Sequence, residues 1–268
     1  MNVQVLSAAN KAVGTVKLPV QFDEPVRADL IKRAVEAIQS HDRQQYGTDP
    51  RAGRKQSAKL SRRRRDYKTS YGKGISRSPR KTMNRRGTQM QWTGAFAPNT
   101  VGGRRAWAPT AKKVWSQKIN EKERRKAIRS AIAATMHKDI VVARGHKVPQ
   151  SFPFLIDDAF EAMKTAGEVE QALLGLQLDA ELARASVTRT VGGRAARRGR
   201  GIKRAVGPLL VVSKSAPVMK AARNIPGVDV VVVDRLNARL LAPGRDPARL
   251  TLFTAAAVQK MEKEGLFI

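Results

Sequence analysis

The most distinctive chemistry in this sequence is carried by arginine and lysine side chains grouped in two segments. The first, Arg51 to Lys113, holds 19 Lys and Arg residues against one acid, Asp66, and contains the run Arg62 to Arg65. The second, Gly192 to Val206, holds six basic residues and no acid. A guanidinium is a planar fork that matches the oxygens of a phosphate. Side chains of this type at this density therefore indicate a polyanionic partner.

The rest of the chain is nearly balanced in charge. The whole protein has 268 residues and a formal net charge of +30. Outside the two segments, there are 27 basic and 21 acidic residues. Unscreened charge of one sign destabilises a compact state by self-repulsion. Nucleic acid is the commonest polyanion bound by such basic segments, so we expect the two segments to bind nucleic acid and the remainder to fold as an ordinary domain.

Glycines and aromatic side chains interrupt the first segment. Glycine lets a backbone approach a phosphate closely, and planar rings stack on the unpaired bases that RNA exposes. The rings are Tyr67, Tyr71, Trp92, Phe96 and Trp107. The large apolar residues show no sustained period of a helix or a strand. We therefore expect a long internal loop that a polyanion orders, because it cannot bury enough apolar surface to offset its own ordering entropy.

Patterns for other chemistry are missing from the sequence. The chain has no cysteine, so disulfides, thiol catalysis and cysteine-type zinc sites are excluded. His41, His137 and His146 share no metal-ligand spacing, and no phosphate-binding Gly-x-x-x-x-Gly-Lys string occurs. The pair Asp157–Asp158 is interpreted as a helix N-terminus, where acids complement the helix dipole. We expect no catalytic residues, no metal and no cofactor, and no membrane span, because no apolar run approaches about 20 residues.

The remaining sequence predicts an α/β fold with a mostly parallel sheet flanked by helices. Continuous apolar runs such as "PLLVVS" and "VDVVVV" suit strands covered on both faces, and alternating strands and helices favour a parallel sheet. Asn120 with Glu123 is typical of a capping box. The predicted strands are Asn2–Leu6, Val13–Leu18, Asp139–Ala143, Phe152–Ile156, Pro208–Ser213, Val228–Val233 and Leu250–Phe253. The predicted helices are Pro25–Ser40, 120–136, 157–167 (capped by Asp157 and ended by Gly167), Glu168–Leu178, Pro217–Arg223 and Thr254–Glu264 (ended by Gly265).

Several longer strings resemble one protein family nearly end to end. They are "SYGKGISRSPR" (70–80), "GAFAPNTVGGRRAWAPTAKKVW" (94–115), "NEKERRKAIRSAIAAT" (120–135), "GHKVP" (145–149), "ARNIPGVDVVVVDRLNARLLAPG" (222–244) and "RLTLFTAAAV" (249–258). Together they are similar to the family of universal large-subunit ribosomal protein four, in its archaeal and eukaryotic form. The resemblance implies a structural constituent of the large ribosomal subunit that binds its RNA, assists assembly and is not an enzyme.

The resemblance also implies that different parts of the chain have different roles. Residues 1–45 and 116–268 would form a globular α/β domain, 46–115 an extended loop penetrating RNA, and 192–206 a second basic loop contacting RNA. The loop tip would line the nascent-peptide exit tunnel, where the familiar Gly-x-Gly-Arg core has Ile75 in place of arginine and Arg77 two residues on. The tip residues are Tyr71, Gly72, Lys73, Gly74, Ile75, Ser76 and Arg77.

The residues expected to contact RNA are the cations of both segments and two tryptophans. They are Arg51, Arg54, Lys55, Arg62, Arg63, Arg64, Arg65, Lys68, Arg80, Lys81, Arg85, Arg86, Trp92, Arg104, Arg105, Trp107, Lys112, Lys113, Arg194, Arg197, Arg198, Arg200, Lys203 and Arg204. The partners implied are large-subunit ribosomal RNA and other large-subunit proteins, including universal large-subunit protein twenty-two at the tunnel. The implied location is the cytoplasmic ribosome, with no homo-oligomer and no membrane.

Two other functions remain open at this point. An RNA-modifying enzyme could combine an α/β cofactor domain with a basic loop that grips RNA, although its motifs are missing. A chromatin-type packaging protein would explain the charge and would bind duplex DNA comparably, but it does not explain why the charge lies inside the chain.

Overall fold

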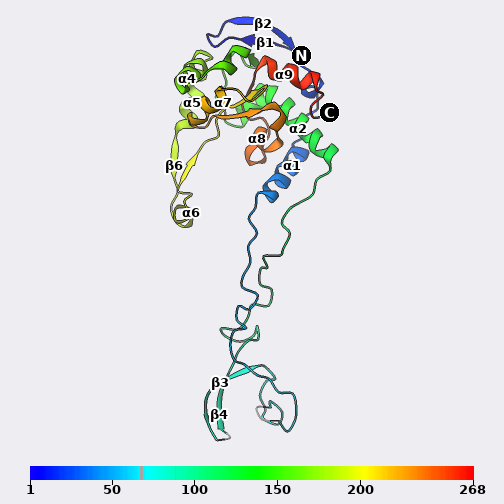
Figure 1. Cartoon of the computed structure of the whole chain (residues 1–268), viewed down its shortest axis with the longest axis vertical. Coiled ribbons are helices and arrows are strands. Elements are labelled where there is room, and N and C mark those ends of the chain that lie inside the picture. The colour runs from blue at the N-terminus through cyan, green and yellow to red at the C-terminus, as the bar shows by residue number, and fades with distance from the viewer. Residues whose placement is uncertain (67–68, 88) are drawn as a thin grey trace. The chain divides into compact units, whose positions relative to one another are not determined.

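The computed structural model describes residues 1–66, 69–87 and 89–268, which form two compact units. Met1–Asp42 together with Ser116–Ile268 is the main unit, and Arg43–Trp115 is the basic unit. Both contain helix or strand, and the described residues have a mixed α/β content (Figure 1). The α/β class predicted from the sequence is therefore confirmed.

The strands of the main unit form small sheets. Three parallel strands pair in the order β10-β8-β9, namely Thr251–Phe253, Leu209–Val212 and Asp229–Val232. A second sheet has the order β2-β1-β5, where β1 (Asn2–Leu6) is antiparallel to β2 (Ala12–Lys17) and parallel to β5 (Phe154–Ile156). One parallel bridge, Ile156 to Thr254, joins strand ends of these two sheets. The predicted single sheet is thus seen as smaller sheets of mixed direction.

The position of strand β8 between two hydrophobic clusters explains why its sequence is apolar without alternation. Leu209 and Val211 pack into one hydrophobic cluster, whereas Leu210 and Val212 pack into a second one. Successive strand residues point to opposite faces of a sheet, so both faces of β8 are covered. All four residues are at most 1% exposed.

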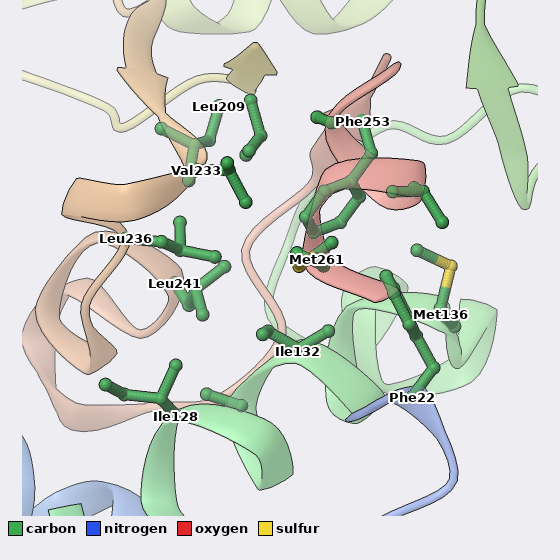
Figure 2. Packing of buried hydrophobic residues seen from close by; sticks show 14 of the residues in the cluster. Phe22, Ile128, Ile132, Met136, Leu209, Val233, Leu236, Leu241, Phe253 and Met261 are labelled. Carbon is green, nitrogen blue, oxygen red and sulfur yellow. The ribbon is translucent and has the colours of Figure 1, made fainter. Parts of the chain in front are cut away.

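Helices supply the covering side chains of the first cluster. Helix α2 (Glu121–Met136) contributes Ile128, Ile132 and Met136 to this cluster. In Figure 2, Ile132 lies toward Met261 of α9 (Ala255–Lys263), Met136 toward Phe22 of the 3-10 turn Val20–Phe22, and Ile128 toward Leu241 of α8 (Ala238–Leu241). The rings of Phe22 and Phe253 meet edge to face, with centroids 5.4 Å apart. The other helices of the main unit are α1 (Ala28–His41), α3 (Lys138–Ala143), α4 (Ala166–Gly175), α5 (Asp179–Ser186), α6 (Arg194–Arg197) and α7 (Val218–Ala221). None of the described helices is long and apolar enough to cross a bilayer.

Most predicted elements of the main unit are confirmed within a few residues. The N-terminal hairpin, the helix after Pro25 and the three strands of the β10-β8-β9 sheet lie where the patterns placed them. The Thr254 hydroxyl accepts from the Ala257 amide at the start of α9, as predicted for a cap, and Gly265 follows its end with φ +57°.

Three local predictions are wrong. Residues 139–143 are not a strand but belong to α3, where Val141 is buried and Val142 is half exposed, a one-sided pattern that suits a helix. Asp157 caps only a 3-10 turn, Asp158–Ala162. Gly167 lies inside α4 rather than ending a helix, because Thr165 and Glu168 form a capping box there.

The predicted capping box of α2 is also wrong, although the helix begins at the expected residue. Asn120 is the N-cap, but its side chain accepts no bond from the helix. Glu123 pairs instead with Arg33 of α1 at 3.0 Å. The carboxylate therefore joins two helices rather than closing its own first turn.

A buried charged cluster anchors the segment that follows α5. Glu181 is fully buried, and its carboxylate accepts from Arg184 Nη2 at 2.6 Å and lies 2.7 Å from His146 Nδ1. Arg184 also donates to the Val206 carbonyl at 2.6 Å. Burial tends to raise the pKa of Glu181, but the bonds from Arg184, His146 and the Lys147 amide outweigh it and lower the pKa to about 2.

The basic unit has strands that the sequence did not predict. β3 (Arg80–Arg86) and β4 (Gln89–Gly94) form an antiparallel hairpin with a register shift between Thr82 and Asn84 (Figure 1). The shift interrupts the alternation along β3, and β4 alternates exposed with half-buried residues over only six positions, so no sustained period of 2 runs through the segment. These two strands add to the long loop that the sequence predicted here.

Close backbone contacts, many of them at glycine, hold the rest of the basic unit. The Thr48 amide donates to the Pro109 carbonyl at 2.9 Å. A Cβ added at Gly47 would lie 2.2 Å from the Ala111 nitrogen, and one at Gly103 would lie 2.0 Å from the Ala97 carbonyl oxygen. Only glycine permits these approaches, so part of the glycine content serves the unit's own packing.

Aromatic and cationic side chains close the two ends of the basic unit, and we call this cluster the neck. The rings of Tyr46 and Trp115 stack with centroids 5.3 Å apart and planes 20° apart. The Arg43 guanidinium lies 3.9 Å and the Lys113 ammonium 4.3 Å from the Trp115 ring centroid. The buried indole N–H of Trp115 has no acceptor within the described chain, so its ring contacts hold it.

We predict that Glu181→Gln lowers the free energy of unfolding at pH 7 by about 3 kcal/mol, because Arg184 and His146 lose their charged partner. The Glu181 carboxylate has a lowered pKa, so its stabilisation is complete above pH 4.5 and is lost as the pH falls toward about 2. Urea unfolding at a series of pH values checks this. Glu170→Gln, an exposed change, is the control, and equal stability of both variants would contradict the prediction.

We predict that Trp115→Ala loosens the neck without unfolding the main unit. The variant loses one ring stack and two cation–π contacts, together about 2 kcal/mol of local stability. Hydrogen exchange of the Thr48 amide should accelerate, while the melting temperature of the main unit stays the same. Trp107→Ala is the matched control, because Trp107 is 91% exposed. Unchanged exchange at Thr48 would show that the ring contacts do not hold the neck.

Candidate nucleic-acid interface

The run Arg62 to Arg65 is displayed on a small closed loop. Ser61 and Thr69 form a bridge across its base, and the Ser61 hydroxyl donates to the Asp66 carboxylate at 2.5 Å. Ser61 and Thr69 are buried, whereas the four arginines are exposed. The chain itself therefore fixes the ends of this loop and leaves its guanidiniums toward the outside.

These guanidiniums are not neutralised from within. In the described part of the chain, Arg62 to Arg65 take part in no ion pair. In the same unit Lys55 does pair with Asp49, at 2.6 Å, which raises the pKa of Lys55 and lowers that of Asp49. Both partners are largely exposed, so solvent screens the pair and its contribution to stability is small. Most of the positive charge of the basic unit is thus available to an external anion.

The predicted tip, Tyr71 to Arg77, is shaped by contacts between its own side chains. The Arg77 guanidinium lies 4.5 Å from the Tyr71 ring centroid, and Gly72 and Gly74 have φ of +71° and +64°. Arg80 donates to the Ser76 carbonyl at 2.6 Å and to its hydroxyl at 3.0 Å. Arg80, predicted to contact RNA, therefore has one side of its guanidinium occupied in holding the tip.

The two predicted stacking tryptophans differ in exposure. Trp92 on β4 is partly buried, and the Lys73 ammonium lies 5.1 Å from its ring centroid. Trp107 is 91% exposed and makes no ring contact within the described residues. Trp107 thus offers the freer surface for a base, whereas Trp92 shares its face with a tip cation.

The second segment is a hairpin rather than a plain loop. β6 (Thr188–Thr190) pairs with β7 (Ile202–Arg204), and α6 lies at the end of this basic hairpin (Figure 1). Its six predicted cations, Arg194, Arg197, Arg198, Arg200, Lys203 and Arg204, are all exposed. Arg189 lies directly opposite Lys203. Like charges directly opposite on paired strands are destabilising. An anion beside this pair would therefore reduce the electrostatic repulsion between the two side chains.

The structure brings most predicted residues to the surface of the unit to which each belongs. Lys68 lies outside the described residues. Arg80, Lys81, Arg104 and Trp92 are partly buried. The other predicted residues of the basic unit are exposed: Arg51, Arg54, Lys55, Arg62, Arg63, Arg64, Arg65, Arg85, Arg86, Arg105, Trp107, Lys112 and Lys113.

Sequence reasoning missed two cations. Arg189 stands just before the second segment and becomes part of its basic surface only through pairing with β7. Arg43 precedes the first segment and becomes part of the neck through Trp115, which is distant in sequence. A hairpin prediction at residues 188–204 would have found the first, whereas the sequence carries no signal for the second.

No group of three or more metal-ligating side chains gathers in the described ranges. His146 is bound to Glu181 and Arg184. Asp157 and Asp158 each accept a backbone amide, the latter from Ala256 at the start of α9 at 2.6 Å. The carboxylate pair thus binds backbone amides, Asp157 at the start of a 3-10 turn and Asp158 at the start of α9.

Comparison with known proteins gives a consistent result along the chain. A family model described as "Ribosomal protein L4/L1 family" matches residues 16–264. The "Large ribosomal subunit protein uL4" of Nanoarchaeum equitans is 43% identical over 268 residues, covering 100% of both chains. Proteins of the same name are 39% identical in Methanopyrus kandleri, over 98% of both chains, and 39% identical in Archaeoglobus fulgidus, over 97% of both.

The match includes both basic segments as well as the main unit, and the relatives have the same length as this chain to within a few per cent. The similarity over nearly the whole chain therefore leads to one assignment: the chain belongs to the ribosomal protein L4/L1 family.

Proposed function

We propose that the chain is a structural constituent of the large ribosomal subunit and binds the subunit's RNA through its two basic segments. The observation that carries this proposal is the exposed arginine run Arg62 to Arg65, which is held on a closed loop without ion pairs in the described chain. Guanidiniums on a loop whose ends are held, without carboxylate partners, bind phosphate oxygens without first breaking an internal ion pair. Membership in a ribosomal protein family confirms the prediction that the chain is not an enzyme.

Each part of the chain has a distinct role in this proposal. Residues 1–45 and 116–268 form the globular α/β domain, whose small sheets are flanked by helices. Residues 46–115 form an extension that penetrates RNA, and 192–206 form a second RNA contact. Trp107 supports the stacking part of the proposal, since an exposed ring can receive an unpaired base.

The tip Tyr71 to Arg77 lines the peptide exit tunnel in this proposal, beside universal large-subunit protein twenty-two. Support comes from the family and from the shape of the tip, in which Arg80 holds Ser76 and Arg77 covers Tyr71. A tip fixed by its own contacts presents a constant wall to a passing peptide. The same proposal places the protein in the cytoplasm on the ribosome, helping the subunit to assemble and bound to RNA and other subunit proteins rather than to a second copy of itself.

We predict that replacing Arg62 to Arg65 with alanine weakens binding to large-subunit ribosomal RNA. The slope of the logarithm of affinity against the logarithm of salt should fall by about 3, because each lost phosphate contact removes roughly 0.7–0.9. The melting temperature of the main unit should not change. Binding titrations at several salt concentrations measure the slope.

The matched control for this variant removes four exposed lysines of the main unit, Lys11, Lys17, Lys32 and Lys263. It loses the same charge and should change the slope less. Equal slopes for both variants would mean that total charge, and not the arginine loop, determines binding.

We predict that replacing Tyr71 to Arg77 with a Gly-Ser segment of equal length still allows subunit assembly but alters ribosome pausing on nascent chains. The replacement removes the ring contact of Arg77 and the Ser76 carbonyl position that Arg80 holds, so the tip loses its fixed shape. Ribosome profiling of cells carrying the variant is the measurement. A pausing profile identical to that of the wild type would oppose placement of the tip in the tunnel.

A further inference from the structure

Strand β9 leaves one edge of a parallel sheet open. It is the outer strand of the order β10-β8-β9, and among the described residues it pairs with β8 alone. The Asp229 amide donates toward β8, to the Pro208 carbonyl at 3.2 Å. Backbone groups alternate in direction along a strand, so those of Val230 and Val232 point to the opposite, unpaired side. An open strand edge is a template for another strand.

A groove runs beside this edge. Its cavity measures about 600 Å³ and is lined by residues of β9 and of the α7 segment. Val228 is buried, while Met219 and Val230 are half-buried parts of the hydrophobic cluster beneath them. The groove therefore offers apolar contacts next to unpaired backbone groups, the combination by which a sheet edge binds an extended peptide.

The charges around the groove are unbalanced. Lys220 and Arg223 line it, are exposed and take part in no ion pair within the described ranges. The one acid of the lining, Asp229, is held by the buried Arg249 at 2.6 Å. Two cations thus remain without partners, and an occupant with acidic side chains complements them.

We propose that β9 binds an extended peptide segment of a protein partner, which adds as a strand and carries acidic side chains beside apolar ones. Its apolar side chains pack on Met219 and Val228, and its acids meet Lys220 and Arg223. RNA is the less fitting occupant, because an apolar floor and an open strand edge offer little to a phosphate backbone. The proposal is independent of the two basic segments and stands whether or not they bind RNA.

The test uses the full-length chain and amide hydrogen exchange, because the basic segments of this protein would bind any acidic probe and obscure a simple titration. The probe is a capped heptapeptide, Val-Thr-Glu-Thr-Val-Thr-Glu, whose odd-numbered residues place valine and glutamate on the same face of an added strand. We expect it to slow the exchange of Val230 and Val232. The same peptide with methylated backbone nitrogens, which keeps its charge but cannot donate to an edge, should give no protection at these residues.

Two charge variants locate the binding. Lys220→Glu with Arg223→Glu should weaken the protection at Val230 by about tenfold in peptide concentration, since two ion pairs become repulsive. Lys11→Glu with Lys17→Glu, an equal charge change just before β2 and at its last residue, in the other sheet, should leave it unchanged.

Three outcomes would overturn the proposal. The first is that the peptide gives no protection at Val230 and Val232, and the second is that the methylated peptide protects them equally. The third is that a uridine oligonucleotide protects these amides and the peptide does not, which would identify a nucleic-acid surface instead.

Discussion

The cost of burying a charge without a partner is the constraint on which the rest of this structure depends. Most of the net charge of +30 lies in two segments that contain a single acid. Such segments cannot join a hydrophobic core, since a buried charge without a partner is strongly unfavourable. The buried apolar residues therefore lie mostly in the main unit, and the cations lie on loops and hairpins at the surface. In the basic unit, backbone hydrogen bonds, close backbone contacts at glycine and contacts between aromatic rings stabilise the fold in place of a large hydrophobic core.

The main unit makes this separation possible because its central strands are covered on both faces. Leu209 and Val211 face one cluster while Leu210 and Val212 face the other, so a short strand connects two cores. The buried charged groups of the described chain have partners: Arg249 pairs with Asp229, and Glu181 pairs with Arg184 and His146. The buried Glu161 accepts from the Ser213 and Thr254 hydroxyls. Arg184 also donates to the Val206 carbonyl, so the polar cluster around Glu181 binds the base of the basic hairpin.

The sequence predicted the main unit better than the basic one, for a physical reason. Apolar periodicity records burial, and it located β8, β9, β10, α1 and α2, each of which contributes buried residues to the core. It failed for β3 and β4, whose side chains are mostly polar and whose register shifts at Thr82 to Asn84. It also failed at α3, because five residues are too few to separate a period of 2 from one of 3.6.

The candidate interface was predictable in composition but not in geometry. A charge count was enough to identify Arg62 to Arg65 as exposed, whereas the Ser61–Asp66 bond that closes their loop depends on side-chain contacts that no spacing rule encodes. Arg80 shows the same limit: its type suggested a phosphate ligand, and its position makes it a bond donor to Ser76.

The neck bears on how much the length of the basic unit can vary within this family. Tyr46 and Trp115 hold the two ends of the basic unit together across a long intervening stretch. Once the ends of a chain segment are fixed, doubling the length between them costs only about 0.6 kcal/mol in closure entropy. Insertions and deletions between Tyr46 and Trp115 therefore change the length of the basic unit at little thermodynamic cost, while the neck stays the same.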